Sequence, residues 1–447
     1  MASMINEPSR IYDIALRLHT ELYGSDKYPH PFTGDILFGK AELLRNRRDF
    51  DESHVLYKKA YANRLRALRN GHPLLATTLF GLAENYRLRG NLKDAKSYHD
   101  QALQLRFDAF GNSGDGMPLH VSIAESKLGI CSVLFDRGLY HDAIVPCEES
   151  IVIRRQVCGS DHFLTAQSEH MLANIYLALQ DHEKASGLFE HALQVKKATY
   201  GTSHVEVATC MSNFALMLKA QGDYDKALKM FHKVMNIQMK LYGAVHPDVA
   251  SSLNNIGAVY FAKGMFAESL PYYQKSLEMK RTCFGSDHAN VAASLHNLGG
   301  VYQSLQNYSR AKELYEEALS IQTSLFDYFH PCIADTMNNL GILLFSQGEY
   351  EEAESVYDRA LEIKQRVYGA NHPAYASSLH NLAALLHSLG RLQDAKNAYI
   401  RCREIRTEHL GSDHPDTVAC VENLRALKLQ QLIEVEKCVS DKIEMYQ

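Results

Sequence analysis

Apolar and small residues recur along this chain at steps of three and four, grouped into two blocks in every 42-residue unit. Such steps place residues on one face of an α-helix, so each block predicts one amphipathic helix. In the unit that begins at His246, the first block comprises Val249, Leu253, Ile256, Gly257 and Tyr260, and the second comprises Phe266, Tyr273, Leu277 and Met279. Gly264 separates the blocks and Gly285 ends the second, where glycine commonly stops a helix in a left-handed cap. Each unit is therefore predicted to be a helix–turn–helix hairpin.

One histidine marks the start of every unit. Successive members are 42 residues apart, except for one gap of 48: His30, His72, His120, His162, His204, His246, His288, His330, His372 and His414. Self-similarity at such a period is the signature of a solenoid of stacked units. A metal role for these histidines is disfavoured because neighbours would lie about 20 Å apart across two helices. Zinc needs ligands at about 2 Å, so the histidines are predicted to be junction residues at helix starts.

The period divides the chain into nine units with a cap at each end. The units are residues 30–71, 72–119, 120–161, 162–203, 204–245, 246–287, 288–329, 330–371 and 372–413. Residues 1–29 are predicted to hold a capping second helix, and residues 414–447 a lone first helix over 416–431 followed by a charged final helix. The long gap contains a Gly- and Pro-bearing insertion at 111–119, which is predicted to be a hinge.

Small and aromatic residues return at the same place in each unit. The first block has glycine or alanine at Ala83, Ala173, Ala215, Gly257, Gly299, Gly341 and Ala383. The second block has alanine at Ala95, Ala143, Ala185, Ala227, Ala311, Ala353 and Ala395, then an aromatic at Tyr57, Phe189, Phe231, Tyr273, Tyr315, Tyr357 and Tyr399. Small residues let two helices approach closely, and the ring is predicted to fill the gap between neighbouring units.

This pattern resembles the tetratricopeptide repeat, whose usual unit is shorter, at roughly 34 residues. The longer spacer and the G-x-x-HP-x-V-A junction are similar to the repeats of kinesin light chains and nephrocystin-type ciliary proteins. The best local matches are residues 246–264 and 350–373. The resemblance implies an all-α, right-handed superhelical solenoid whose first helices face a concave groove.

The position just before the first-block leucine points into that groove in the family that the chain resembles. Here it reads Gly39, Gly81, Gly129 and Met171, and then Asn213, Asn255, Asn297, Asn339, Asn381 and Asn423. An asparagine amide both donates and accepts, so it can pair with the backbone of an extended peptide. The resemblance to kinesin light chains implies that these six residues recognise a peptide. The alternative is that they hydrogen-bond only within or between helices.

A second row of groove positions lies about one turn further along each first helix. It reads Arg87, Phe135, Leu177, Lys219, Phe261, Gln303, Phe345 and His387. Mixed aromatic and polar residues suit side-chain pockets for a linear motif, and the row lacks the Lys/Arg run expected of a groove for acidic tails. Variable solvated residues are the alternative interpretation.

Composition limits the classes of partner and the cellular compartment that are expected. The net charge of -5 disfavours nucleic acid or an anionic membrane as the main partner, because both select dense positive charge. The nine cysteines form no C-x-x-C pair, so they are predicted to be free thiols in a reducing compartment. The N-terminus has no apolar signal region, and no apolar run reaches the length of a spanning helix. A cytoplasmic protein is predicted. The resemblance to kinesin light chains and nephrocystin-type proteins implies an association with the cytoskeleton or the cilium.

No nucleophile–base arrangement stands out from the repeat register, so enzyme activity, cofactors and metal sites are not expected. The G-x-x-x-x-G-K match at 34–40 is followed by Ala41 and lies within a predicted helix, which excludes a nucleotide-binding loop. The leading hypothesis is an adaptor or scaffold that binds a linear segment of a partner in the groove. The alternative is a regulatory or sensor repeat module of a larger signalling, ciliary or motor assembly. The chain lacks the long heptad segment of a kinesin light chain.

Overall fold

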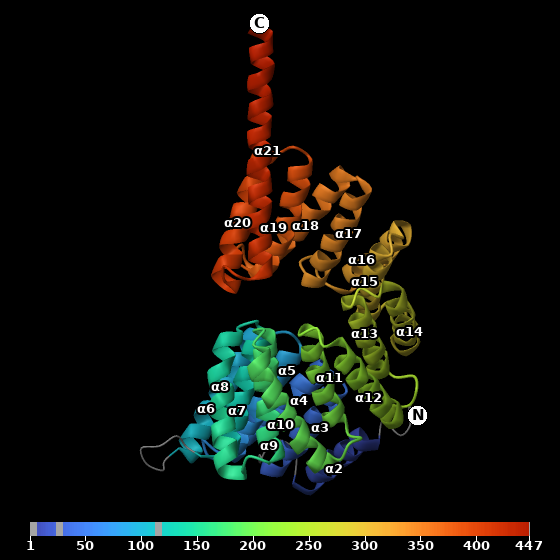
Figure 1. Ribbon diagram of the computed structural model, residues 1–447. Helices are drawn as coiled ribbons and strands as arrows, with labels where there is room; N and C mark the ends of the chain where they lie inside the picture. Colours follow the sequence, from blue (N-terminus) through green and yellow to red (C-terminus); the bar gives the residue numbers. More distant parts are fainter. Residues whose placement is uncertain (1–6, 24–29, 112–118, 447) are drawn as a thin grey trace. The chain divides into compact units, whose positions relative to one another are not determined.

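The structure is a computed structural model that describes the backbone of residues 7–23, 30–111 and 119–446, and the side chains of 10–22, 30–111 and 119–433 (Figure 1). Every regular element in these ranges is an α-helix. The chain divides into two compact units, unit 1 over Met1–Gln221 and unit 2 over Gly222–Gln447.

Unit 1 contains a lone helix followed by hairpins. Its helices are α2 (Glu7–Tyr23), α3 (Pro31–Asn46), α4 (Phe50–Ala67), α5 (Pro73–Leu88), α6 (Leu92–Phe110), α7 (Val121–Asp136), α8 (Tyr140–Cys158), α9 (Phe163–Ala178), α10 (His182–Tyr200) and α11 (Val205–Ala220). Unit 2 has the same alternation and ends in a long helix. Its helices are α12 (Tyr224–Tyr242), α13 (Pro247–Ala262), α14 (Phe266–Phe284), α15 (Ala289–Ser304), α16 (Tyr308–Leu325), α17 (Pro331–Gln347), α18 (Tyr350–Tyr368), α19 (Pro373–Ser388), α20 (Leu392–Leu410) and α21 (Pro415–Tyr446).

Within each unit every helix packs against the helices before and after it. The first helices of successive hairpins also contact one another, as α5 does with α7 and α15 with α17. In the described part of either unit, no comparably close contact joins two second helices. Within each unit the first helices therefore lie side by side, and the predicted all-α solenoid of helical hairpins is confirmed.

The core of most hairpins contains an aromatic ring from the second helix, and His99 and Cys147 take its place in α6 and α8. The rings that are no more than 1% exposed belong to Tyr57, Phe189, Phe231, Tyr315, Tyr357 and Tyr399. The second-block alanines from Ala95 to Ala395 named above are fully buried. Burying one such ring contributes about 1.5–3 kcal/mol, and this gain needs a covering hairpin on both sides.

Each repeated histidine is the N-cap of a first helix, as the period predicted. In all ten, Nδ1 accepts the backbone N–H of the second residue after it at 3.1–3.3 Å. The bond satisfies one of the helix's otherwise unpaired N–H groups. Several of the rings also stack on an aromatic ring four residues earlier, as His288 does on Phe284 with centroids 4.3 Å apart.

A buried cation at the end of most second helices secures the next hairpin. Its members are 2–8% exposed: Arg64, Arg106, Arg154, Lys196, Lys280, Lys364 and Arg406. Five of them donate to a hydroxyl or thiol on the following first helix, as Arg64 does to Thr78 at 2.6 Å and Lys280 to Ser294 at 2.8 Å. Burial alone would penalise these charges, so each depends on its partner oxygen or sulfur.

The turns between the two helices of a hairpin require a positive φ. Gly264 has φ +78, as predicted, and Gly285 has φ +82 with ψ 174. Gly285 follows the second helix and precedes the next hairpin. Its φ and ψ define an extended conformation that glycine adopts, not the left-handed helical conformation that was expected. At the position of Gly264 in other hairpins, Arg48, Gln180 and Gln306 adopt φ between +60 and +65.

The predicted ends are partly wrong. One helix, α21, runs unbroken over Pro415–Tyr446, where two helices were expected. No glycine or proline interrupts residues 416–446, so nothing there stops a helix. The N-terminal capping helix is present as α2. Most of the predicted hinge at 111–119 lies outside the described residues.

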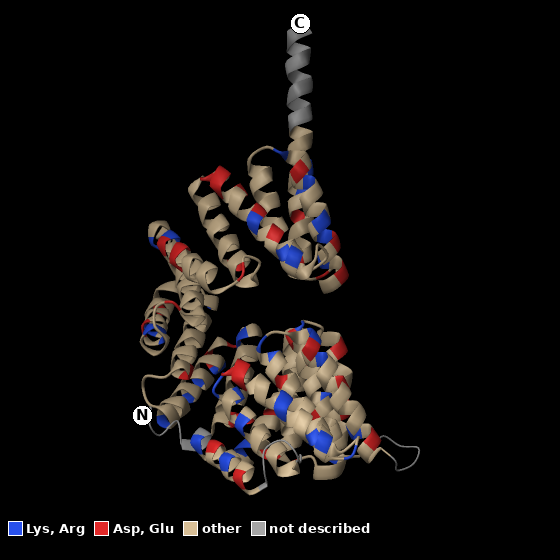
Figure 2. Cartoon of the chain, turned by 180° about the vertical axis from the view of Figure 1, so that it is seen from behind, with Lys and Arg blue, Asp and Glu red and all other residues tan. Residues whose placement is uncertain are grey.

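The described helices do not include one that is long and apolar enough to cross a membrane. Basic and acidic residues are interspersed along the same helices in Figure 2, in keeping with the small net charge.

Replacing the N-cap histidine tests its structural role. His288→Ala removes the acceptor for the Asn290 N–H at 3.1 Å, and we expect local opening of α15 to become about 1 kcal/mol easier. His288→Asn restores a side-chain acceptor and should lose much less. Hydrogen exchange of the first amides of α15 measures both variants. Equal protection of these amides in the two variants would contradict the capping role.

A second substitution tests the turn strain. Gln306 has φ +60, which costs a residue with a Cβ roughly 1 kcal/mol. We expect Gln306→Gly to raise the free energy of unfolding and Gly264→Gln to lower it, each by about 0.5–1 kcal/mol. Because no atom lies within 4 Å of a Cβ built on Gly264, only the backbone conformation changes. Urea titrations measure the free energy of unfolding of both variants. A lower free energy of unfolding in Gln306→Gly would show that the positive φ of Gln306 is not a source of strain.

Candidate functional site

The predicted asparagines all lie in the middle of first helices and are half-buried. Asn213 is on α11 in unit 1. The other five are in unit 2, on α13, α15, α17, α19 and α21: Asn255, Asn297, Asn339, Asn381 and Asn423. We call these five residues the asparagine row. The structure thus gathers five of the six predicted residues in one unit.

Each amide N–H₂ of the row from α15 onward donates to the preceding first helix. Asn297 donates to Oδ1 of Asn254 at 3.1 Å, and Asn381 donates to Oδ1 of Asn338 at 3.0 Å. Asn339 and Asn423 lie 3.1 and 3.2 Å from Nε2 of a histidine. The acceptor is always 43 residues earlier in the chain, so each bond joins two neighbouring hairpins.

Asn213 makes the same kind of contact in unit 1. Its Nδ2 lies 3.0 Å from Nε2 of His170 and 3.0 Å from Oδ1 of Asn174. One half of the amide is therefore used in pairing between helices, which was the alternative interpretation of these residues.

The other half of each amide is unused. The Oδ1 atoms of Asn297, Asn339, Asn381 and Asn423 accept no hydrogen bond from the described residues, and none of them is among the buried atoms without a partner. They are therefore open to solvent. Because the N–H₂ group is anchored, the surface of the first helices carries carbonyl oxygens in fixed orientations.

The sequence analysis missed the acceptors of these bonds. They are the residues that directly precede a row position: His170, Asn254, His296, Asn338 and His380. The sequence contains a pattern that could have identified them, a recurring His-Asn or Asn-Asn pair at 254–255, 296–297, 338–339 and 380–381. Alternation of histidine with asparagine shows that either side chain can supply the acceptor.

These histidines act as neutral acceptors. Nε2 of His296 faces the amide of Asn339, and Nδ1 lies 3.0 Å from the hydroxyl of Thr336. Burial lowers the pKa of His296. The pKa of His170 is lowered to about 3, first by burial and then by the nearby charge of Lys196. A protonated ring could not accept the amide N–H, so the bond needs the neutral form.

The aromatic ring of the second helix explains why asparagine begins only halfway along the chain. In unit 1 the ring presses on the first helix of the next hairpin: a Cβ built on Gly81 would lie 2.6 Å from Tyr57, and one on Gly129 would lie 2.4 Å from His99. No asparagine fits at these two row positions without displacing the ring.

In unit 2 the ring presses on its own first helix. A Cβ built on Gly299 would lie 2.8 Å from Tyr315, and one on Gly341 would lie 2.6 Å from Tyr357. The glycine has moved by two residues, from Gly-Leu-Ala at 81–83 to Asn-Leu-Gly at 339–341. The ring then packs against the glycine that lies two residues after the asparagine, so the asparagine position can carry a side chain.

The second predicted row lies at the ends of the first helices and is half-buried. Phe261 packs against Phe266 with ring centroids 5.1 Å apart, and Phe345 against Tyr350 at 5.9 Å. Gln303 accepts the hydroxyl of Tyr315 at 3.0 Å. Burial lowers the pKa of Lys219, which lies in unit 1. These side chains are anchored to their hairpins, and part of each stays exposed.

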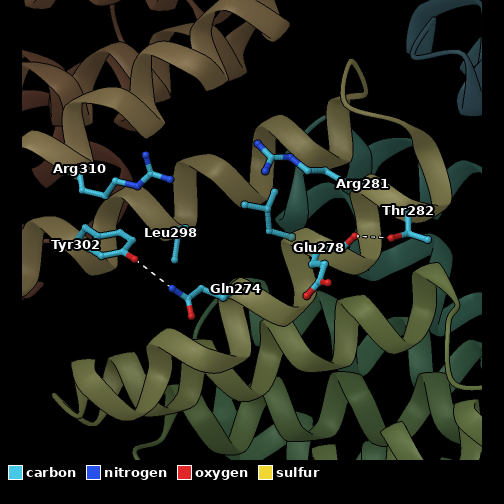
Figure 3. A pocket seen from close by; sticks show the side chains of 8 residues that line it. Gln274, Glu278, Arg281, Thr282, Leu298, Tyr302 and Arg310 are labelled. Atoms are coloured by element: carbon cyan, nitrogen blue, oxygen red, sulfur yellow. Dashed lines mark hydrogen bonds between the residues drawn. The ribbon is translucent and has the colours of Figure 1, made fainter.

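A cavity of about 470 Å³ lies apart from the row, between α14, α15 and α16 (Figure 3). Most of its polar lining is already paired. Gln274 donates to the hydroxyl of Tyr302 at 3.1 Å, and Arg281 and Arg310 each form an ion pair with a glutamate outside the lining. Both arginines of the lining are therefore paired, and Glu278 is the charged lining residue whose side chain has no ion pair among the described residues.

One group of potential metal ligands occurs among the described residues, formed by His380, Cys402 and Cys420. Their ligand atoms lie within 4.8 Å of one another. The Arg406 guanidinium donates to Cys420 at 3.3 Å, so a cation already lies against this group.

Comparison with protein families gives one match. The tetratricopeptide repeat model matches residues 32–106, 122–198, 169–240, 206–282, 248–324 and 332–408. No curated protein sequence matches the chain.

Solved structures share the fold. The apo form of the quorum sensor NprR from B. thuringiensis aligns over 83% of this chain and 97% of its own, with TM-score 0.55 and 14% identity. A signal transduction ATPase with numerous domains and a tetratricopeptide repeat sensor, from Pyrococcus horikoshii, aligns over 84% of this chain and 53% of its own, with TM-score 0.53 and 17% identity. A kinesin light chain-type protein of Podosopora anserina with nearly identical TPR-like repeats covers 46% of this chain and 97% of its own, with TM-score 0.41 and 24% identity.

The neutral histidine beside Asn213 predicts acid sensitivity. Because the pKa of His170 is lowered from 6.5 to about 3 in the fold, its contribution to stability is complete above about pH 6.5 and is lost as the pH falls from there towards 3. Between about pH 7 and pH 5 we expect a loss of roughly 2 kcal/mol.

His170→Asn is the matched control, since asparagine is the acceptor at Asn254 and Asn338. Urea titrations at the two pH values should show a smaller loss of unfolding free energy in the variant. An identical loss in both proteins would show that His170 does not carry the effect.

Proposed function

Because this chain belongs to the tetratricopeptide repeat family, we propose that it is a non-enzymatic scaffold that binds an extended segment of a partner protein along the asparagine row. The observation that carries the proposal is the set of open Oδ1 atoms on amides whose N–H₂ groups are already bonded. Each such oxygen offers an acceptor to a backbone N–H of the bound segment, for about 1 kcal/mol.

Anchoring makes these acceptors effective. A free asparagine side chain loses rotamer freedom when it binds a ligand, which costs about 0.5–1.5 kcal/mol. In Asn297, Asn339, Asn381 and Asn423 that cost has been met in folding, because the bond to the preceding hairpin already holds the amide. The pairing between hairpins and the recognition of a peptide are therefore compatible roles for one side chain.

The spacing suits a strand-like ligand. First helices of successive hairpins contact one another, so they are about 10 Å apart and not about 20 Å as expected from the sequence. An extended chain rises about 3.3 Å per residue. One asparagine would therefore meet about every third residue of the bound segment. Hydrogen bonds to a peptide backbone do not distinguish one sequence from another. Selectivity would therefore come from contacts with the side chains of Phe261, Gln303 and Phe345, and in unit 1 with that of Lys219.

The charges point to a partner segment without a strong net charge. The second row holds Lys219 but no run of basic residues, and acidic and basic side chains are interspersed elsewhere. A cytoplasmic location, at the cytoskeleton or the cilium, belongs to the same proposal and rests on the resemblance to kinesin light chain and nephrocystin-type repeats.

A second candidate function is a sensor module of a larger assembly. It is favoured by the fold similarity to the quorum sensor NprR and to the sensor-bearing ATPase, of which this chain matches 53%. A sensor would respond to its ligand by a change in assembly. Size-exclusion chromatography with and without a bound peptide, together with a proximity-labelling list of partners, separates the two candidates.

The row itself is tested with selected peptides. The full-length chain is panned against a phage-displayed library of random linear peptides, and enriched peptides are labelled for fluorescence anisotropy. We expect the double variant Asn297→Ala, Asn339→Ala to weaken binding by roughly tenfold or more, because two acceptors are lost.

Asn397→Ala is the control, because Asn397 is an exposed asparagine on the second helix α20 that pairs with Gln393 at 3.1 Å. Circular dichroism melts confirm that all variants fold. Unchanged affinity in a folded double variant would leave the row with pairing between hairpins as its sole role.

A further inference from the structure

Two cysteines far from any C-x-x-C spacing meet at the last hairpin. Sγ of Cys402 on α20 lies 3.1 Å from Sγ of Cys420 on α21, and both residues are fully buried. The sulfur atoms of a disulfide are about 2.05 Å apart, so an approach of about 1 Å would join them. Both thiols are free in the structure.

The surroundings favour a thiolate at Cys420. Its sulfur receives an N–H of Arg406 at 3.3 Å and faces Nδ1 of His380 at 3.4 Å. Because Nε2 of His380 accepts the amide of Asn423, the ring proton is at Nδ1 and points to the sulfur. The hydrogen bond from Cys402, with the His380 and Arg406 contacts, lowers the pKa of Cys420.

Cys402 is held in the opposite state. Its single thiol proton is shared between two acceptors, the backbone oxygen of Ala376 at 3.2 Å and the Cys420 sulfur at 3.1 Å. The hydrogen bond to Cys420 and burial raise the pKa of Cys402. The pair thus consists of one nucleophilic sulfur and one protonated thiol beside it, which is the arrangement of a reactive and a resolving cysteine.

The same chain holds an unreactive copy of this arrangement. In α8 and α9, Ser150 and Ser168 have their Oγ atoms 2.9 Å apart, and Arg154 donates to Ser168 at 2.9 Å. Ser150 also donates to the backbone oxygen of Ala124, as Cys402 does to that of Ala376. Serine therefore satisfies the packing and hydrogen-bonding needs of both positions, and structure alone does not require sulfur in the last hairpin.

A metal ion fits this group poorly. Arg406 Nη1 lies 3.3 Å from the Cys420 sulfur and 3.5 Å from Nδ1 of His380, and it also donates to the backbone oxygen of Asp416 at 2.8 Å. The guanidinium therefore occupies the side from which both ligands would bind a cation. Zinc would also need a fourth ligand, which the group of three does not supply.

We propose that Cys402 and Cys420 form a peroxide-reactive dithiol that closes to a disulfide and fastens α21 to α20. The thiolate of Cys420 attacks one oxygen of a hydroperoxide. The O–O bond breaks, the departing oxygen takes a proton and leaves as water or an alcohol, and Cys420 becomes a sulfenic acid.

The sulfur of Cys402 then attacks Sγ of Cys420. The S–S bond forms and the S–O bond breaks, and the hydroxide leaves as water with the thiol proton of Cys402. The two sulfurs together give up two electrons, and these reduce one hydroperoxide.

Local opening of the end helix gives the oxidant its access. α21 is the last described helix and packs on α20, and beyond the buried Leu427 its Leu429 and Leu432 are 60% and 61% exposed. Among the described helices α21 packs closely on α20 alone, so it opens at lower cost than a helix packed on two neighbours. Oxidation during such an opening would lock the helix in place once it closes.

The test treats the reduced full-length chain with a small molar excess of hydrogen peroxide and maps a non-reduced digest by mass spectrometry. We expect a Cys402–Cys420 disulfide before oxidation at Cys131, Cys147 or Cys210, which are equally buried. Amide exchange across 415–427 should slow about tenfold on oxidation and recover on reduction, because the link restricts the open state.

Three variants use residues that the chain carries at equivalent positions. Cys402→Ser should stop the reaction at a sulfenic acid on Cys420 that a dimedone probe captures, and Cys420→Ser should abolish the reaction. His380→Leu places at α19 the residue type that Leu128 supplies at the same position of α7. In the Cys402→Ser chain it should slow dimedone capture severalfold, because the donor beside Cys420 is lost. It should also lower the melting temperature slightly, because it removes the acceptor of the Asn423 amide.

Two results would overturn the proposal. One is oxidation of other cysteines with Cys402 and Cys420 left as thiols. The other is stoichiometric zinc binding to the reduced chain that disappears in Cys402→Ser, which would make the group a metal site. Melting curves of each variant confirm folding before either result is interpreted.

Discussion

The burial of one aromatic ring between two first helices is the interaction on which the rest of this protein depends. A single hairpin leaves the ring half-covered, so the chain must add a hairpin on each side before the apolar surface is removed from water. The ring also needs a glycine against it, and the location of that glycine decides what else the first helix can carry. In α5 and α7 the glycine occupies the position that asparagine takes later in the chain, and in α13, α15 and α17 it lies two residues later and leaves that position to asparagine.

Polar groups at every junction follow from the same stacking. Each first helix begins with unpaired N–H groups close to a neighbouring hairpin, and a histidine satisfies one of them. Each buried cation depends on polar partners, most of them on the next hairpin, while Arg64 and Lys364 also pair with an aspartate of their own hairpin. These bonds tie neighbouring hairpins together, and they make stacking specific in register as well as favourable. They also restrict the protonation states that the folded chain tolerates, as His170 shows.

In the function that we propose, the asparagine row combines a packing role with a binding role. The two ends of an amide have different chemistry, so the donor end can hold the hairpins together while the acceptor end faces solvent. The last hairpin shows the reverse case, in which cysteine replaces serine at two packing positions and adds reactivity without changing the contacts.

The sequence by itself determined the hairpin period, the start of every first helix, the buried alanines and rings, and the positions of the asparagines. These features depend on contacts within a few residues or on a fixed repeat, so the order of residue types along the chain is enough to predict them. Only the tertiary structure decided which acceptor each asparagine meets, which hydroxyl each buried cation reaches, and that Cys402 lies against Cys420. Those pairs are 14–43 residues apart on different helices. They exist only when the rise and rotation of one hairpin upon the next bring two side chains together, and the pattern along the chain does not encode that placement.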